Sequence, residues 1–207
     1  MTVPRAFPIH AIGMAASTGG PVALRQVLAD FAAEGDAACL PPVFITQHLP
    51  HAFTGLLAAQ LAQDARLPCA EAAQGEPVRP GRIYLAPGDY HMTVAASERG
   101  HVIKLLQTPP LHFCRPAADP MLESLAVAYG KNTLAVILTG MGTDGCTGCD
   151  KIKAAGGTVF VQDAASSAVW GMPGHVAEAG LADRVIALSA MGRAIRRRLG
   201  DTGNHAP

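Results

Sequence analysis

The chain has 207 residues, of which 49% are hydrophobic and 15% are charged, and its mean hydropathy is +0.23. This composition excludes intrinsic disorder and predicts elements that are buried on more than one face. Sixteen basic residues balance sixteen acidic ones, and aromatic residues make up only 5% of the chain. The sequence therefore lacks both the basic surplus and the aromatic stacking platforms that favour nucleic-acid binding.

The chain contains no signal for membrane insertion or secretion. No apolar run approaches the ~20 residues of a membrane span. Pro8 and His10 interrupt the N-terminal segment, which carries one early charge at Arg5, unlike a secretory signal. The five cysteines are Cys39, Cys69, Cys114, Cys146 and Cys149. Because their number is odd and they are scattered, we expect reduced thiols in a soluble, cytoplasmic protein.

In the first third of the chain, two strands alternate with two helices. We predict strands at 9–15 and 42–47, and a helix that begins at Pro21, whose missing N–H costs nothing in a first helical turn. The apolar residues expected on the buried faces of the two helices are Val22, Leu24, Val27, Leu28 and Phe31, and then Phe53, Leu56, Leu57 and Leu61.

The middle of the chain differs in character. Short strands at 82–86, 91–95 and 102–106 are separated by turn-like sequences, which predicts a small antiparallel β meander beside a parallel sheet. A helix is expected at 121–129 and a buried strand at 133–138.

The last third returns to alternating strands and helices. The expected elements are a helix at about 146–155, a strand at 157–162, a short helix at 172–174, a strand at 185–186, a C-terminal helix and a frayed tail at 200–207. We therefore predict one α/β domain over residues 1–207, with its core at about 9–199. The expected fold is a doubly wound, mostly parallel sheet in a Rossmann-like three-layer arrangement.

Three predicted strand ends carry polar residues suited to catalysis. Ser17, His48 and Asp144 each follow a different strand, and ligands of such sheets gather beyond the carboxyl ends of the strands. A hydroxyl, an imidazole and a carboxylate are the parts of a nucleophile, its base and the group that orients the base. Backbone N–H groups at the helix start after Ser17 are suited to an oxyanion.

Each of these residues also has a plainer interpretation. The Ser-Thr-Gly-Gly turn is also typical of a helix N-cap or a phosphate cradle, although it lacks both the G-x-G-x-x-G and the G-x-x-x-x-G-K-[ST] patterns. His48 is equally explained as a hydrogen-bonded histidine at a strand end, and Asp144 as part of an Asx turn. From spacing alone, a nucleotide-binding α/β module remains a remote alternative.

Five sequence strings resemble, in order and spacing, the catalytic domain of the chemotaxis protein-glutamate methylesterase family, CheB. They are IGMAASTGGP, FITQHLPHAFT, RIYLAPGDYHM, VILTGMGTDG and VWGMP, and the resemblance extends over about 9–199. The family hydrolyses γ-glutamyl methyl esters on the cytoplasmic helices of chemoreceptors and releases methanol. Its members can also deamidate receptor glutamines.

The resemblance implies roles for individual residues. It identifies Ser17 as the nucleophile, His48 as the base and Asp144 as its partner, the same three residues that the strand ends indicate. Thr18, Gly19, Met141 and Gly142 match family positions near the substrate or the oxyanion. The implied mechanism is acyl transfer through a glutamyl-enzyme, with no metal and no organic cofactor. The implied partner is the cytoplasmic domain of a methyl-accepting receptor, with a separate regulatory protein as a further possibility and no nucleic acid.

The chain departs from the family pattern in three respects. The family usually has an N-terminal receiver domain, whereas this sequence begins at the catalytic domain, so we expect a stand-alone member. Cys114 and Ala117 stand where the family pattern has histidine and serine, and Ala164 replaces an acidic residue. Because these loops face the substrate side in the resemblance, the departures bear on substrate choice more than on chemistry.

Two features of the sequence are weaker candidates for chemistry. Cys146 and Cys149 form a C-x-x-C pair at a helix start, where thiol pKa values fall. We favour simple packing over redox activity for this pair, and two cysteines alone supply too few ligands for a zinc site. The histidines show no metal-ligand spacing. Beside the methylesterase, the alternatives are a protein-glutamine deamidase with the same triad and a non-catalytic adaptor that docks on receptors.

Overall fold

The fold is built around one seven-stranded sheet. A computed structural model describes residues 8–33 and 39–200. All neighbouring strands of the sheet are parallel, in the order β3-β4-β2-β1-β7-β8-β9. The strands are β1 (Ala11–Ala16), β2 (Val43–Gln47), β3 (Cys69–Glu71), β4 (Ile83–Leu85), β7 (Thr133–Ile137), β8 (Thr158–Gln162) and β9 (Arg184–Ile186). The predicted doubly wound, mostly parallel sheet is confirmed.

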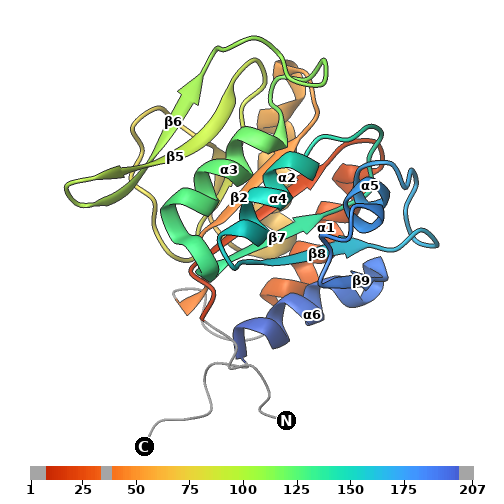
Figure 1. The fold of residues 1–207 in the computed structure, drawn as a ribbon. Coiled ribbons are helices and arrows are strands. Elements are labelled where there is room, and N and C mark those ends of the chain that lie inside the picture. Colours follow the sequence, from red (N-terminus) through yellow and green to blue (C-terminus); the bar gives the residue numbers. More distant parts are fainter. Residues whose placement is uncertain (1–7, 34–38, 201–207) are drawn as a thin grey trace, which may run out of the picture.

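Helices cover both faces of this sheet (Figure 1). They are α1 (Gly20–Ala32), α2 (His51–Ala65), α3 (Ala118–Tyr129), α4 (Cys146–Ala154), α5 (Met172–Glu178) and α6 (Leu188–Gly200), with a short 3-10 helix, η2 (Gly130–Asn132). Residues of α1, α2 and α6 pack in one hydrophobic cluster, and residues of α3, α4 and α5 pack in a second. The result is the predicted three-layer arrangement.

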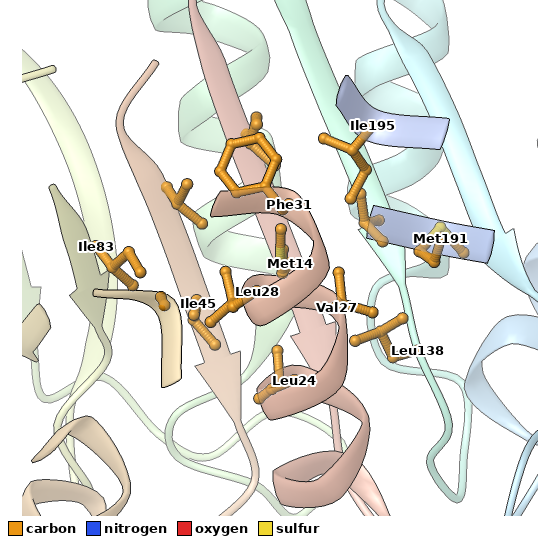
Figure 2. Packing of buried hydrophobic residues seen from close by; sticks show 14 of the residues in the cluster. Met14, Leu24, Val27, Leu28, Phe31, Ile45, Ile83, Leu138, Met191 and Ile195 are labelled. Atoms are coloured by element: carbon orange, nitrogen blue, oxygen red, sulfur yellow. The ribbon is translucent and has the colours of Figure 1, made fainter. Parts of the chain in front are cut away.

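The central strand β1 divides its side chains between the two clusters. Ile12 and Met14 belong to the first cluster. Figure 2 shows Met14 among apolar residues of α1 and α6. The opposite side of β1 carries small residues. A Cβ on Gly13 would lie 2.8 Å from side-chain carbons of Leu122 and Leu125, so α3 packs directly against the backbone of β1. Full burial of each large apolar side chain stabilises the fold by roughly 1.5–3 kcal/mol.

The small antiparallel unit is a hairpin of two strands, β5 (His91–Ser97) and β6 (Gly100–Leu106). The strand predicted at 82–86 exists as β4, but it lies in the parallel sheet between β2 and β3. All three residues of β4 are buried, which is typical of a strand inside a parallel sheet rather than of a half-exposed hairpin strand. The short, half-buried strand β3 was missed by the sequence analysis.

Three apolar residues predicted to face the core are exposed instead. Val22 is 69% exposed, Phe53 54% and Leu56 65%. These residues lie near the N-terminal ends of α1 and α2. The predicted short helix at 172–174 is longer and continues to Glu178.

The predicted frayed tail lies outside the described residues, except for Gly200, which ends α6. No helix in the described ranges is long and apolar enough to cross a membrane.

Candidate active site

The three predicted catalytic residues follow strands that are neighbours in the sheet. β1 lies between β2 and β7, so the order of the strands reverses at β1. Ala16, the residue before Ser17, is in register with Gln47, the residue before His48. Asp144 lies in the loop after β7. The three loops therefore meet at the carboxyl edge of the sheet, at the switch point where such folds bind their ligands.

His48 and Asp144 are in direct contact. His48 donates from Nε2 to Oδ2 of Asp144 over 2.6 Å. The side chain of His48 is 11% exposed and that of Asp144 is 1% exposed. Because Nε2 is engaged by the carboxylate, Nδ1 is the ring nitrogen left to exchange a proton with another group.

Two backbone N–H groups also bind the carboxylate of Asp144. Ala118 donates to Oδ2 over 2.6 Å and Asp119 donates to Oδ1 over 3.1 Å. Burial alone would raise the pKa of Asp144, but the hydrogen bonds from His48, Ala118 and Asp119 outweigh it and hold this pKa below its ordinary value. The carboxylate therefore stays ionised at neutral pH.

Ser17 is fixed through its backbone. Its N–H donates to the carbonyl oxygen of Thr139 over 3.0 Å, and its own carbonyl oxygen accepts from Gly20 N–H over 2.8 Å. A Cβ on Gly140 would lie 2.8 Å from Cβ of Ser17, so this glycine makes room for the serine. Within the described ranges, the Ser17 hydroxyl has no hydrogen bond to His48, as is common for such pairs without substrate.

The residues expected near an oxyanion lie in two loops, one that contains Ser17 and one that follows Gly140, whose backbone packs against Ser17. The backbone N–H groups of Thr18, Gly19, Met141 and Gly142 have no hydrogen-bond acceptor within the part of the chain that the structure describes. Gly19 has φ +80°, and a Cβ there would lie 2.7 Å from that of Ala168, so the turn needs glycine. Met141 and Gly142 are exposed. The two loops thus carry backbone donors that are free to bind another acceptor.

Gln47 joins the loops of the serine and the histidine, a role that the sequence analysis did not assign. The side chain is 1% exposed. Its Nε2 donates to the carbonyl oxygen of Ser17 over 2.9 Å and to that of His48 over 3.2 Å. Its place beside His48 in the Q-H-x-P string was the available signal.

His91 is fully buried and both of its ring nitrogens are hydrogen-bonded. Nδ1 accepts from the N–H of Ala117 over 3.0 Å, and Nε2 donates to the carbonyl oxygen of Pro109 over 3.2 Å. Burial lowers the pKa of His91, so the ring is neutral at physiological pH. It supports the segment that leads into α3 and lies next to the N–H groups that bind Asp144.

One cluster of residues has the composition of a metal site. The ligand atoms of His112, Asp119 and Asp144 lie within 4.8 Å of one another. Each carboxylate oxygen of the two aspartates already accepts a hydrogen bond. A metal ion would have to displace His48 or backbone N–H groups, so we assign this cluster to hydrogen bonding.

The cysteines near the site are poor thiolates. Burial raises the pKa of Cys146 and that of Cys149, which is fully buried in the second cluster. Burial and the nearby charge of Asp144 likewise raise the pKa of Cys114. The low pKa typical of a thiol at a helix start is therefore not found at the C-x-x-C pair, in agreement with a packing role.

Comparison with known proteins agrees with this geometry. A family model described as CheB methylesterase matches residues 12–195. The chain is 48% identical over 187 residues to a protein-glutamate methylesterase/protein-glutamine glutaminase of Maricaulis maris, covering 90% of this chain and 46% of that protein. Identity to a similarly named protein of Caulobacter vibrioides is also 48%, over 93% of this chain and 55% of that protein. The chain thus spans about half the length of these relatives.

A solved structure of the same family also matches the fold of this chain. The crystal structure of the Thermotoga maritima CheB methylesterase catalytic domain superposes with a TM-score of 0.87 at 35% identity, covering 92% of this chain and 99% of that chain. The resemblance found in the sequence strings is therefore confirmed by the family model, by the relatives and by the fold. The chain belongs to the CheB methylesterase family.

Proposed function

We propose that this chain is a protein-glutamate methylesterase that acts as a serine hydrolase. Its substrates are glutamyl methyl esters on the cytoplasmic helices of a chemoreceptor, and it works in the cytoplasm in chemotaxis adaptation. The observation that carries the proposal is the buried, ionised Asp144 in contact with His48 beside the loop of Ser17. This arrangement suits the activation of a serine hydroxyl for acyl transfer.

The proposed reaction has two stages. Nδ1 of His48 takes the hydroxyl proton as Oγ of Ser17 attacks the ester carbonyl carbon, and Asp144 stabilises the imidazolium that forms. The tetrahedral intermediate expels methanol, which leaves with the proton from His48. Water then attacks the glutamyl-enzyme with His48 as base, which restores the serine hydroxyl and releases the glutamate side chain.

The charge of the tetrahedral intermediate needs donors that are already in place. We assign this role to the free N–H groups of the loops at Thr18 and Gly19 and at Met141 and Gly142. Preorganised donors of this kind contribute about 10²–10³-fold to the rate each.

Deamidation of glutamine is a second candidate activity. The printed names of the relatives include protein-glutamine glutaminase as well as methylesterase. The same acyl-enzyme would form from a glutamine amide, with ammonia in place of methanol as the leaving group. The two activities differ in the group that His48 protonates, and the same residues serve both.

The test is methanol release from methylated receptor membranes, with ammonia release measured in parallel. We expect Ser17→Ala to lower the rate by at least about 10³-fold. Ser189→Ala is the matched control, because Ser189 is exposed on α6, and it should leave the rate unchanged. Equal methanol release by wild type and Ser17→Ala would refute the assignment of the nucleophile.

The adaptor alternative makes a different prediction. If the chain only docks on receptors, wild type releases neither product, while Ser17→Ala binds a receptor cytoplasmic fragment and signals as wild type does.

A further inference from the structure

The N-termini of α3 and α4 are each capped by an aspartate that belongs to the other helix segment. Asp144 lies in the loop before α4 and accepts from the first two N–H groups of α3, those of Ala118 and Asp119. Asp119, the second residue of α3, accepts with Oδ1 from the N–H of Gly148 in the first turn of α4 over 2.7 Å. Asp144 therefore caps α3, and Asp119 caps α4.

Neither helix has a cap of its own. Ala117 and Gly145 occupy the N-cap positions, and neither has a side-chain acceptor. The first N–H groups of a helix need acceptors when they are buried. Asp144 and Asp119 therefore supply the acceptors that the N-cap residues do not have. The first N–H groups of each helix are bound by a carboxylate from the segment of the other helix.

The helices α3 and α4 pack closely where these two caps lie. A Cβ on Gly148 would lie 2.6 Å from Cβ of Leu122 in α3. Because Gly148 has no side chain, its backbone reaches the carboxylate of Asp119 directly. Without that carboxylate, the buried N–H of Gly148 would have no acceptor, which is costly inside a protein.

Asp119 also contacts, through His112, the part of the loop that precedes Asp144. Its Oδ2 accepts from Nε2 of His112 over 3.0 Å, and Nδ1 of the same ring lies 3.5 Å from Oγ1 of Thr143. Thr143 precedes Asp144 and Gly148 follows it. The carboxylate of Asp119 thus fixes the loop on both sides of Asp144.

From this network we propose that Asp119 is the positioning residue for Asp144. It holds the loop so that Oδ2 of Asp144 meets Nε2 of His48, and it touches neither the substrate nor the serine. The inference rests on the proposed function only for its kinetic consequence, because the contact between His48 and Asp144 is present without substrate.

Three variants test the proposal in the full chain. Asp119→Ala removes the cap and should lower kcat by about 100-fold, the effect of a small misplacement of a catalytic group, with KM unchanged. Asp119→Asn keeps an acceptor for Gly148 and should recover most of the loss. Asp183→Ala is the matched control, because Asp183 also accepts a hydrogen bond from a backbone N–H, that of Val159, over 2.8 Å. This contact lies at the N-terminal end of β8, away from the candidate site. Asp183→Ala should retain wild-type kcat.

A spectroscopic measurement separates this proposal from the proposed function. The proton shared by His48 and Asp144 should give a proton NMR signal downfield of the amide region, assigned by its loss in Asp144→Asn. We expect Asp119→Ala to lose or broaden this signal, and Asp119→Asn and Asp183→Ala to keep it. This result does not depend on any substrate, so it stands even if wild type releases no methanol.

Two outcomes would overturn the proposal. One is a kcat and a downfield signal in Asp119→Ala equal to those of Asp183→Ala. The other is an equal loss in Asp119→Asn and Asp119→Ala, which would assign the effect to the charge of Asp119 and not to its cap. If Asp119→Ala does not fold, Asp119→Leu, which keeps the size of the side chain but offers Gly148 no acceptor, takes its place with the same expected losses.

Discussion

At the scale of single residues, Asp144 and Asp119 share one network, yet their surroundings shift their pKa values in opposite directions. Burial would raise the pKa of both. At Asp144, three hydrogen bonds outweigh burial and lower the pKa. At Asp119, burial prevails over the hydrogen bonds from Gly148 and His112 and raises it. The carboxylate that is proposed to stabilise an imidazolium is thus the one held in its charged form.

The neutral ring of His91 predicts a dependence of stability on pH. Burial lowers the pKa of His91 from its ordinary value of 6.5, so the unfolded chain binds this proton at a higher pH than the folded one does. The stability that the neutral ring contributes is complete above pH 6.5 and is lost as the pH falls from there through the folded pKa. Urea unfolding at a series of pH values should show the free energy of unfolding declining over this window.

His91→Asn tests the origin of this decline. The asparagine oxygen can still accept from Ala117, but the side chain does not titrate, so the decline below pH 6.5 should be shallower than in wild type. His10→Asn, which changes an exposed histidine, should leave the slope as it is. An unchanged slope in His91→Asn would contradict the assignment.

The sequence placed Ser17, His48 and Asp144 at the ends of separate strands, as the structure has them, but it did not predict the contacts that support them. Ser17, His48 and Asp144 each follow a strand, and the strand pattern is visible in the sequence. The supporting contacts join residues far apart, such as Gln47 to Ser17 across 30 positions and Ala117 to His91 across 26. Such pairings depend on how the helices and the hairpin pack, which a single sequence does not specify.

At the scale of elements, the turn at Leu111–Cys114 is strained. Leu111 and Cys114 exchange two backbone hydrogen bonds, of 3.0 Å and 2.8 Å. The two central residues, His112 and Phe113, have φ of +51° and +62°. A tight turn with positive φ at both central positions favours asparagine and glycine, and a bulky residue pays a penalty there.

Phe113→Gly should therefore stabilise the fold by roughly 1 kcal/mol. The side chain of Phe113 is fully exposed, so its removal loses no packing that would offset the relief of strain. The measurement is the midpoint of urea unfolding. Phe53→Gly is the contrast, because Phe53 is an exposed phenylalanine within α2, and glycine there should lower stability by about 0.5 kcal/mol. A lower midpoint for Phe113→Gly would contradict the expectation.

The predicted elements differ in accuracy for physical reasons. The central strands β1, β2, β7 and β8 carry long apolar runs, and all four were predicted to within two residues. The spacing of apolar residues in α1 and α2 gave the helices but not their exposed faces. Val22 and Phe53 lie on the first turns of these helices, at the carboxyl edge of the sheet, where they meet solvent. Periodicity alone does not reveal which apolar residues of a helix remain exposed.

At the scale of the whole molecule, the candidate site lies where the two hydrophobic clusters meet. β1 contributes Met14 to the first cluster and Ala15 to the second, and Ser17 follows directly. His48 is followed by α2 of the first layer, whereas Asp144 is bound by α3 of the opposite layer. The contact of His48 with Asp144 thus joins the two layers across the edge of the sheet, and it requires that both layers are folded.

The cysteines report on this layered packing, because they differ in burial. Cys39 is exposed and should react rapidly with Ellman's reagent at pH 8. Burial raises the pKa of Cys69 to about 12, which leaves about a thousandfold less thiolate than an ordinary thiol. Cys149 lies on the buried face of α4, so its reaction should follow global unfolding. We expect one fast phase in the native protein, slower reaction of Cys114 and Cys146, and five equal thiols in guanidinium. Cys39→Ser should abolish the fast phase. Fast reaction of Cys146 or Cys149 that also lowers methanol release would contradict the packing role of this pair.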